Sequence, residues 1–288
     1  MDYLLANDEL TISASTNGAQ LESIRRNDQM IEYLYQGFPE FWSWQAPILF
    51  PHVGGYKDNY MEVDGKRYTS PRHGFARHSL YQVESVQADQ ITFLLEDSPA
   101  THESYPYAFA LRITYQLVGD AIKVTYQVTN NDDKTIHFSI GAHPAFNVPL
   151  TPDKDWADYE ITFSQSTLKQ YQMDDHGLYR PEATETIAAK PLALTRELFK
   201  NDALIFETDE HMTVTLSDHT HGIELDMGDH PLIGIWSPYP AEAPFVCLEP
   251  WQGITDPTNA THQLADKPFD HTLAVGESFT TSYTIRPF

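Results

Sequence analysis

The sequence predicts an all-β fold, a large antiparallel β-sandwich with few short helices, and three observations favour it. Aromatic residues make up 12% of the chain, with 16 tyrosines and 15 phenylalanines, and such side chains fit a half-buried pleated surface. Apolar and polar residues alternate in short runs throughout the chain, which is the strand period. The regular helices that a βαβ fold requires are missing. We expect one domain over residues 1–288, because sandwiches commonly exceed 200 residues as one domain.

The clearest element is a long hairpin over residues 109–130. Apolar residues occupy every second position from 111 to 117, and again from 122 to 128. Gly119 and Asp120 lie between the two runs and are typical of a tight turn. The pattern therefore predicts two paired strands with one apolar face.

Similar alternation predicts further strands along the rest of the chain. In order, they cover residues 91–96, 136–140, 159–164, 212–216, 223–227, 245–248 and 282–285. A short helical pattern covers 195–201. Residues 144–158 are rich in Pro, Asp and Asn, and residues 236–244 hold three prolines, so both segments are expected to be long loops. Loops on a rigid sandwich commonly carry binding groups.

Charge and cysteine content exclude several classes of protein. The chain has 18 basic and 41 acidic residues, a formal net charge of −23, which disfavours nucleic acid or an anionic membrane as a partner. Cys247 is the one cysteine, so no intrachain disulfide forms, as in a reducing compartment. The first residues lack the pattern of a secretory signal, and no apolar run reaches the roughly 20 residues of a membrane span. We expect a cytoplasmic monomer or homodimer.

Three short islands of sequence place a titratable residue among Gly, Pro and aromatic neighbours. They are R-H-G-F-A-R around His73, G-A-H-P-A-F-N around His143 and C-L-E-P-W around Glu249. Proton transfer needs an acid and a base on a rigid frame, and aromatic walls suit a sugar ring. The islands therefore point to acid–base chemistry on a small molecule such as a sugar.

Glu249 is the most informative of these residues. It follows a strand that is apolar on both faces, so we expect its carboxyl group to be buried at the strand end. Burial beside the Trp251 indole would raise the pKa of this carboxyl group and make it a usable base near neutral pH. The structural alternative is a buried ion pair with an arginine.

The two histidines have weaker signals. His143 ends the apolar run 136–140 and adjoins Pro144, which would end the strand pairing and open the chain into a loop. The alternative is a residue that only caps the strand. His73 precedes Gly74, which permits close approach of the backbone to a ligand, whereas the alternative is a loop histidine bonded to backbone.

Six islands together resemble the aldose 1-epimerase (galactose mutarotase) family over nearly the whole chain. Besides R-H-G-F-A-R and A-H-P-A-F-N they are I-L-F-P-H-V-G at 48–54, D-A-L-I-F at 202–206, G-I-W-S at 234–237 and L-E-P-W-x-G-x-x-D at 248–256, in the family's order. The chain is most similar to bacterial mutarotase-related proteins, whose neighbours include hexose-6-phosphate epimerases. The resemblance implies a mutarotase-like sandwich that interconverts the α and β anomers of an aldose or aldose phosphate, without metal or cofactor.

The resemblance also implies roles for individual residues. Glu249 would take the proton from the O1 hydroxyl, His143 would protonate the ring oxygen, and His73 would steady the ring-oxygen side. Substrate-binding roles are expected for Asp202, Arg72, Arg77, Lys57, Phe75, Asn147 and Trp251. Gly55 stands where related sequences often carry an arginine, so Lys57 or Arg77 would replace that contact.

The charge pattern around His73 raises the question of a phosphorylated substrate. Residues 57–77 hold five basic and three acidic residues in this acidic chain. A sugar phosphate would need such a local positive field. The alternative is a set of ordinary solvated loop charges, which we favour slightly on sequence alone.

Other classes of function have some support in the sequence. The run S-D-H-T-H-G at 217–222 contains a His-x-His pair that could hold a metal on a strand, but its position between two alternating runs favours a hairpin turn. A non-catalytic carbohydrate-binding or sensing protein could use the same sandwich. A glycoside hydrolase would need paired carboxylates, and only Glu249 lies in a distinctive island.

Overall fold

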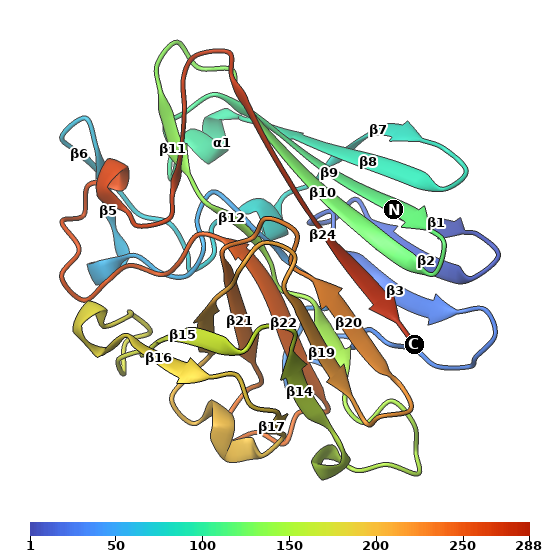
Figure 1. Ribbon diagram of the computed structural model, residues 1–288. Helices are drawn as coiled ribbons and strands as arrows, with labels where there is room; N and C mark the ends of the chain where they lie inside the picture. Colours follow the sequence, from blue (N-terminus) through green and yellow to red (C-terminus); the bar gives the residue numbers. More distant parts are fainter.

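The computed structural model describes residues 1–288, and two large antiparallel sheets face each other in it (Figure 1). The nine-stranded sheet has the order β17 (Leu192–Ala193), β14 (Glu160–Phe163), β19 (Thr213–Ser217), β20 (Gly222–Asp226), β24 (Ser278–Pro287), β10 (Ala121–Asn130), β9 (Phe109–Val118), β8 (Gln90–Glu96) and β7 (Gln82–Val86). The eight-stranded sheet has the order β16 (Glu185–Ala188), β15 (Thr167–Tyr171), β18 (Leu204–Glu207), β21 (Leu232–Trp236), β22 (Phe245–Gln252), β12 (Ile140–Ala142) and β4 (Ile48–Leu49), with β13 (Ala145–Asn147) also paired to β22. The expected all-β sandwich is therefore confirmed.

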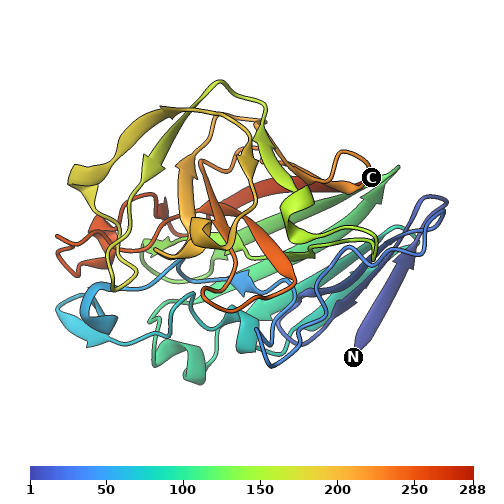
Figure 2. The ribbon, with the colours of Figure 1, turned by 90° about the horizontal axis from the view of Figure 1, so that it is seen from below.

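Three small sheets complete the strands. They are β1 (Asp2–Ala6), β2 (Leu10–Ser15) and β3 (Leu21–Arg26); β11 (Ile136–Phe138) with β23 (His271–Leu273); and β5 (Met61–Val63) with β6 (Lys66–Tyr68). Figure 2 shows the blue N-terminal strands beside the green β9 and β10. The Tyr115 hydroxyl of β9 donates to the Ala19 carbonyl at 2.7 Å, so this small sheet covers part of the large one.

Helical structure is limited to single turns. They are α1 (Pro99–His102) and the 3₁₀ turns η1 (Lys57–Asn59), η2 (Ala76–His78), η3 (Trp156–Asp158), η4 (Pro181–Ala183), η5 (Arg196–Phe199) and η6 (Leu264–Asp266). The helical pattern at 195–201 thus forms only the short turn η5. No helix has the length and apolar character needed to cross a membrane.

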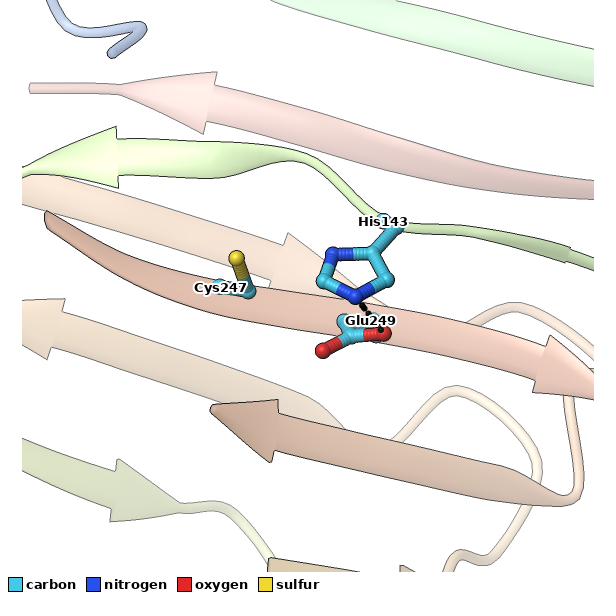
Figure 3. Close-up of side chains that lie close together, drawn as sticks. All are labelled: His143, Cys247 and Glu249. Atoms are coloured by element: carbon cyan, nitrogen blue, oxygen red, sulfur yellow. Dashed lines mark ion pairs between the residues drawn. The ribbon is translucent and has the colours of Figure 1, made fainter. Parts of the chain in front are cut away.

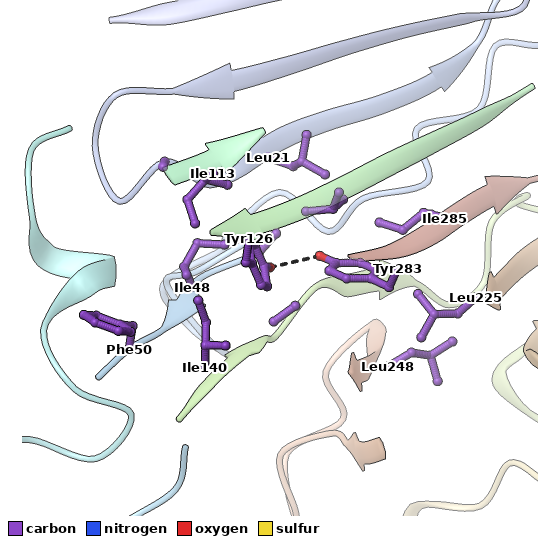
Figure 4. Packing of buried hydrophobic residues seen from close by; sticks show 14 of the residues in the cluster. Leu21, Ile48, Phe50, Ile113, Tyr126, Ile140, Leu225, Leu248, Tyr283 and Ile285 are labelled. Atoms are coloured by element: carbon purple, nitrogen blue, oxygen red, sulfur yellow. Dashed lines mark hydrogen bonds between the residues drawn. The ribbon is translucent and has the colours of Figure 1, made fainter. Parts of the chain in front are cut away.

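The main core is one cluster of 57 buried residues, to which the two large sheets and the small N-terminal sheet all contribute (Figure 4). The predicted hairpin forms β9 and β10, and its apolar face contributes alternate residues to this core. Tyr126 of β10 and Tyr283 of β24 lie within it, and their hydroxyls are 3.2 Å apart. This contact satisfies two polar groups that would otherwise be buried without partners.

The predicted strand 282–285 is part of the longer β24, and two other predicted strands differ from the structure near the candidate site. The run 136–140 divides into β11 and β12, because Ser139 bonds instead to the loop before β5: its N–H donates to the Pro51 carbonyl, and its hydroxyl accepts from Val53 N–H. The strand 245–248 extends to Gln252, and its ladder with β21 includes Glu249, Pro250 and Trp251. The continuous apolar run stops at Leu248, so the pattern could not indicate this continuation.

The run 217–222 forms the β19–β20 turn, as predicted. One Asp218 carboxylate oxygen accepts from the backbone N–H of Thr220 at 2.8 Å and from that of His221 at 2.7 Å. The side chain of His219 is largely exposed. The residues around the His-x-His pair thus serve the turn.

Strand β22 positions the candidate site because its two faces meet different surroundings. Val246 and Leu248 point into the main core. On the opposite face, Cys247 joins one small apolar cluster and Trp251 joins another. Glu249 lies between these two residues on that face, so a buried carboxyl group sits in the gap between two apolar patches.

Candidate functional site

A cavity of about 210 Å³ lies on this outer face of the eight-stranded sheet. Its lining consists of Trp42, Arg72, His73, Arg77, His143, Asp202, Ala203, Trp236, Glu249 and Trp251. The structure therefore brings together all three predicted catalytic residues and four of the seven predicted binding residues. A larger cavity of about 320 Å³ lies along residues 256–268 and contains none of them.

Glu249 lies in the middle of β22, opposite Gly234, rather than at a strand end. The side chain is 1% exposed. Burial raises the pKa of its carboxyl group well above the ordinary value, and the negative charge of Asp202 adds to this rise. The Trp251 indole beside it acts in the opposite direction to our expectation and lowers the pKa of this carboxyl group.

His143 lies in the short link between β12 and β13, both of which pair with β22. Pro144 therefore does not end the pairing, and its carbonyl accepts from the Leu248 N–H at 3.2 Å. The resulting kink in the ladder turns the imidazole across the strand onto Glu249, with 3.1 Å between Nε2 and Oε2 (Figure 3). Burial lowers the pKa of His143 to about 3.

The proton count of this pair follows from these shifts. At neutral pH the raised carboxyl pKa keeps one proton on Glu249, and the lowered imidazole pKa keeps His143 neutral; transfer of that proton across the 3.1 Å contact gives a second form, with Glu249 as carboxylate and His143 as imidazolium. The two forms differ only in which of the two atoms holds the proton. An acid and a base are thus available together at neutral pH without a change in net charge.

His73 is held in one orientation by its own loop. It has φ 69°, and the Gly54 N–H donates to its Nδ1 at 3.1 Å. Because Nδ1 accepts this bond, the proton of the neutral ring is on Nε2, which makes His73 a hydrogen-bond donor. Burial, aided by the charge of Arg72, lowers the pKa of His73 well below its ordinary value, so the ring stays neutral.

The charged residues of the cavity are unequally neutralised. Arg72 pairs with Asp202 at 3.3 Å, and Asp202 has a positive φ of 74°. Arg77 donates to the Arg72 carbonyl at 2.8 Å but contacts no carboxylate. Its Nε is buried without a partner, and burial lowers the pKa of its guanidinium group. The cavity therefore holds one cation without a protein counterion.

Aromatic side chains form the walls. The Trp42 ring packs on His143 with 4.8 Å between centroids, and Trp236 lies edge-on to His143 at 5.6 Å. The Trp251 indole needs glycine beside it, since a Cβ at Gly234 or Gly141 would lie 2.5 Å or 2.7 Å from its ring. The wall residue Trp236 could have been predicted from the G-I-W-S island, whereas the sequence around Trp42 gives no such signal.

Three predicted binding residues lie outside this cavity. Phe75 packs edge-on to Phe50 at 6.2 Å, against the main core. Asn147 donates to the carbonyls of Glu32 and Leu34 at 2.8 Å and 3.0 Å. Lys57 lines a separate hollow beside η1. These side chains support the scaffold or face other surfaces, so we leave them out of the proposed site.

Cys247 is the neighbour of the acid–base pair on β22. His143, Cys247 and Glu249 form a buried group whose potential metal-ligating atoms lie within 4.8 Å of one another (Figure 3). Burial raises the pKa of the Cys247 thiol well above its ordinary value, with a further contribution from Glu249. The cysteine does not line the cavity, so it acts as a small apolar side chain, as expected for a buried thiol.

Comparison with known proteins gives consistent results. The family model described as aldose 1-epimerase matches residues 1–286. The chain is 35% identical over 280 residues to "Protein LacX, chromosomal" of Lactococcus lactis subsp. lactis, covering 93% of each chain. A galactose mutarotase related enzyme from Lactobacillus acidophilus superposes with a TM-score of 0.96 at 32% identity, over 100% of this chain and 97% of that one. A galactose mutarotase-like protein from Lactobacillus casei gives 0.92 at 28%, over 100% of both chains.

Proposed function

The chain belongs to the aldose 1-epimerase family, and from this premise and the geometry of the cavity we propose that it interconverts the α and β anomers of an aldose or aldose phosphate. The observation that carries the proposal is the buried Glu249–His143 pair, 3.1 Å apart and open to the cavity. The neutral His73 donor beside it and the indole walls also suit a pyranose ring.

The proposed reaction conserves the single proton of the pair. In the reactive form, proton transfer from Glu249 to His143 across their 3.1 Å contact presents the bound sugar with Glu249 as carboxylate and His143 as imidazolium. Glu249 takes the O1 proton as the C1–O5 bond breaks, and His143 protonates O5, which gives the open-chain aldehyde. The pair is then a neutral carboxylic acid and a neutral imidazole. Rotation about C1–C2 and reversal of both transfers close the other anomer, so both directions use one protonation state.

His73 and the charged residues complete the proposed roles. The Nε2–H of His73 would donate to the ring-oxygen side of the sugar, where negative charge develops during opening. Asp202 would accept from sugar hydroxyls while Arg72 holds its carboxylate in place. A binding protein without catalysis would have no use for an acid and a base buried in contact, which favours the enzyme over the binder.

Anomer exchange measured by NMR tests the proposal directly. Purified protein is added to a panel of free and 6-phosphorylated aldoses, and the exchange rate between anomeric signals is compared with buffer. We expect acceleration for at least one sugar and its loss in the Glu249→Gln variant. No acceleration with any member of the panel, together with saturable binding, would identify a carbohydrate-binding protein instead.

The pH profile depends on Asp202, whose charge raises the pKa of Glu249. Activity requires the singly protonated pair, so it declines at alkaline pH when that last proton is lost. Asp202→Asn removes one negative charge and frees Arg72, and both changes lower the Glu249 pKa. We expect the alkaline limb of kcat to move to lower pH. An unchanged limb would show that another group controls it; Glu207→Gln, outside the cavity, is the matched control.

Arg77, which has no carboxylate partner, favours a substrate that carries a negative charge. Of the five basic residues noted in the sequence, only Arg72 and Arg77 line the cavity, and Arg77 has no carboxylate partner. An anionic substituent on the sugar would supply one. We expect Arg77→Ala to lower kcat/KM for a 6-phosphorylated aldose about tenfold or more beyond its effect on the neutral sugar. Equal losses for both sugars would exclude a phosphate contact.

A further inference from the structure

His52 is a fully buried histidine two residues before Gly54, and it does not line the cavity. Its Nδ1 lies 3.1 Å from the Gly54 carbonyl oxygen. Because a carbonyl only accepts, Nδ1 carries the proton and donates. Nε2 then accepts from the Ser70 hydroxyl at 2.9 Å. The imidazole thus bridges two loop segments in a single tautomer.

Gly54 connects this bridge to His73. Its carbonyl accepts from the His73 backbone N–H at 2.8 Å as well as from His52, and its own N–H donates to Nδ1 of His73. Gly54 has φ 72°, and a Cβ there would lie 2.4 Å from the Thr255 side chain. The Gly54 backbone is therefore held on both sides of its Cα: the carbonyl of the Gly54–Gly55 peptide by His52, and the N–H of the Val53–Gly54 peptide by Nδ1 of His73.

The direction of the Gly54 N–H determines which ring nitrogen of His73 carries the proton. If Nδ1 of His73 accepts, Nε2 must carry the proton and can donate to a substrate. If Gly54, released by His52 at its carbonyl, rotated so that its N–H left Nδ1, the His73 ring could carry its proton on Nδ1 and would present an acceptor instead. We propose that His52 is a positioning residue that, through Gly54, fixes His73 as an Nε2–H donor. The inference rests on the proposed function for its effect on catalysis, but the tautomer can be measured without substrate.

Three variants separate this role from simple core packing. His52→Leu removes both hydrogen bonds at similar volume, whereas His52→Asn keeps an amide N–H near the place of Nδ1. His230→Leu is the matched control: His230 is equally buried, donates to a backbone carbonyl (Met227) at 2.9 Å, and does not line the cavity. Ser70→Ala, which removes only the outer bond, is a milder variant should His52→Leu not fold.

The readouts are the ¹⁵N side-chain signals of His73 and the kinetic constants. We expect wild type to show protonated Nε2 alone, and His52→Leu to show a mixture with kcat about 10- to 100-fold lower and KM little changed, because misplacement of a reacting group costs rate rather than binding. His52→Asn should restore the Nε2-protonated signals of His73 and kcat. Ser70→Ala should change the signals and kcat in the same direction as His52→Leu, but less. His230→Leu should lose stability only.

The proposal fails if His52→Leu leaves the His73 signals and kcat as in wild type, or if His230→Leu changes them equally. Failure of the proposed function looks different: no anomer exchange with any sugar, while the His73 tautomer still responds to His52→Leu. That second result would support the positioning of His73 and redirect the search for the substrate.

Discussion

Replacing Glu249 with glutamine should reduce kcat by about 10²- to 10⁴-fold, the usual range for loss of a general base. Glutamine has the same shape and can occupy the same site on β22, so the fold and the Trp251 contact should remain. In the proposed mechanism the change removes the group that accepts the O1 proton. KM should change little, since the residue accepts the proton in the transition state and contributes little to ground-state binding. Retention of full activity would refute the assigned base.

The same variant should be more stable than wild type at neutral pH. The folded-state pKa of Glu249 is raised by burial, so above about pH 4.3, its unfolded value, the unfolded chain releases this proton more readily than the folded chain. Stability therefore falls as pH rises, by up to about 1.4 kcal/mol per pH unit, until the folded pKa is reached. Glutamine has no proton to lose, so the stability difference between variant and wild type should grow over this range.

Urea unfolding at several pH values measures that difference. Glu84→Gln is a suitable control, because Glu84 is bonded by Arg112 at 2.8 Å on the surface and this contact lowers its pKa. The contribution of ionised Glu84 to the free energy of unfolding has the opposite sign. It is present above the unfolded-state pKa and is lost as pH falls. The control should keep full activity and show no gain in stability at neutral pH. A pH-independent difference for Glu249→Gln would contradict the raised pKa.

Local patterns predicted much of this architecture, because the alternation of apolar and polar residues along a strand is visible in the sequence. The hairpin of β9 and β10 was predicted to its ends, since its alternation is uninterrupted and a Gly-Asp turn divides it. Glu249 and His143 could be singled out because polar residues in apolar runs are conspicuous. The strand reading nevertheless placed Glu249 at a strand end and expected the pairing to stop after His143, because a local pattern does not reveal that β22 continues or that β12 and β13 share it as a partner.

The remaining parts of the site depend on contacts between distant segments. Trp42 lies on a loop without periodicity, and only the folded chain stacks it on His143. Phe75 and Asn147 stand in islands of distinctive sequence, yet they serve the core and a backbone contact. A motif marks a rigid segment, but which of its side chains face the cavity is decided by the direction of the backbone there. His52 illustrates the converse: in our proposal, a motif residue outside the cavity fixes the tautomer of His73, which lines the cavity.

Gly74→Ala should destabilise the protein by about 3 kcal/mol or more and abolish activity, because backbone strain and collision act together. Gly74 has φ 72°, a conformation that costs other residues about 1–2 kcal/mol. An added Cβ would also lie 2.2 Å from the Phe50 carbonyl oxygen and 2.7 Å from Pro51 Cδ. Phe50 is fully buried, and its carbonyl accepts from the N–H groups of Phe75 and Ala76. Neither the Phe50 backbone nor the Gly74 loop can therefore move easily to relieve the collision.

Gly65→Ala provides the control that separates strain from collision. Gly65 also has φ 72°, but no atom lies within 4 Å of a Cβ built there, so its loss of stability should be limited to about 1–2 kcal/mol of conformational strain. Urea unfolding of both variants, with anomer exchange as the second readout, gives the comparison. The excess loss in Gly74→Ala measures the collision that holds the loop of His73 against Phe50. Equal losses would mean that this loop can relax, and the rigid placement of His73 in the cavity would then need another cause.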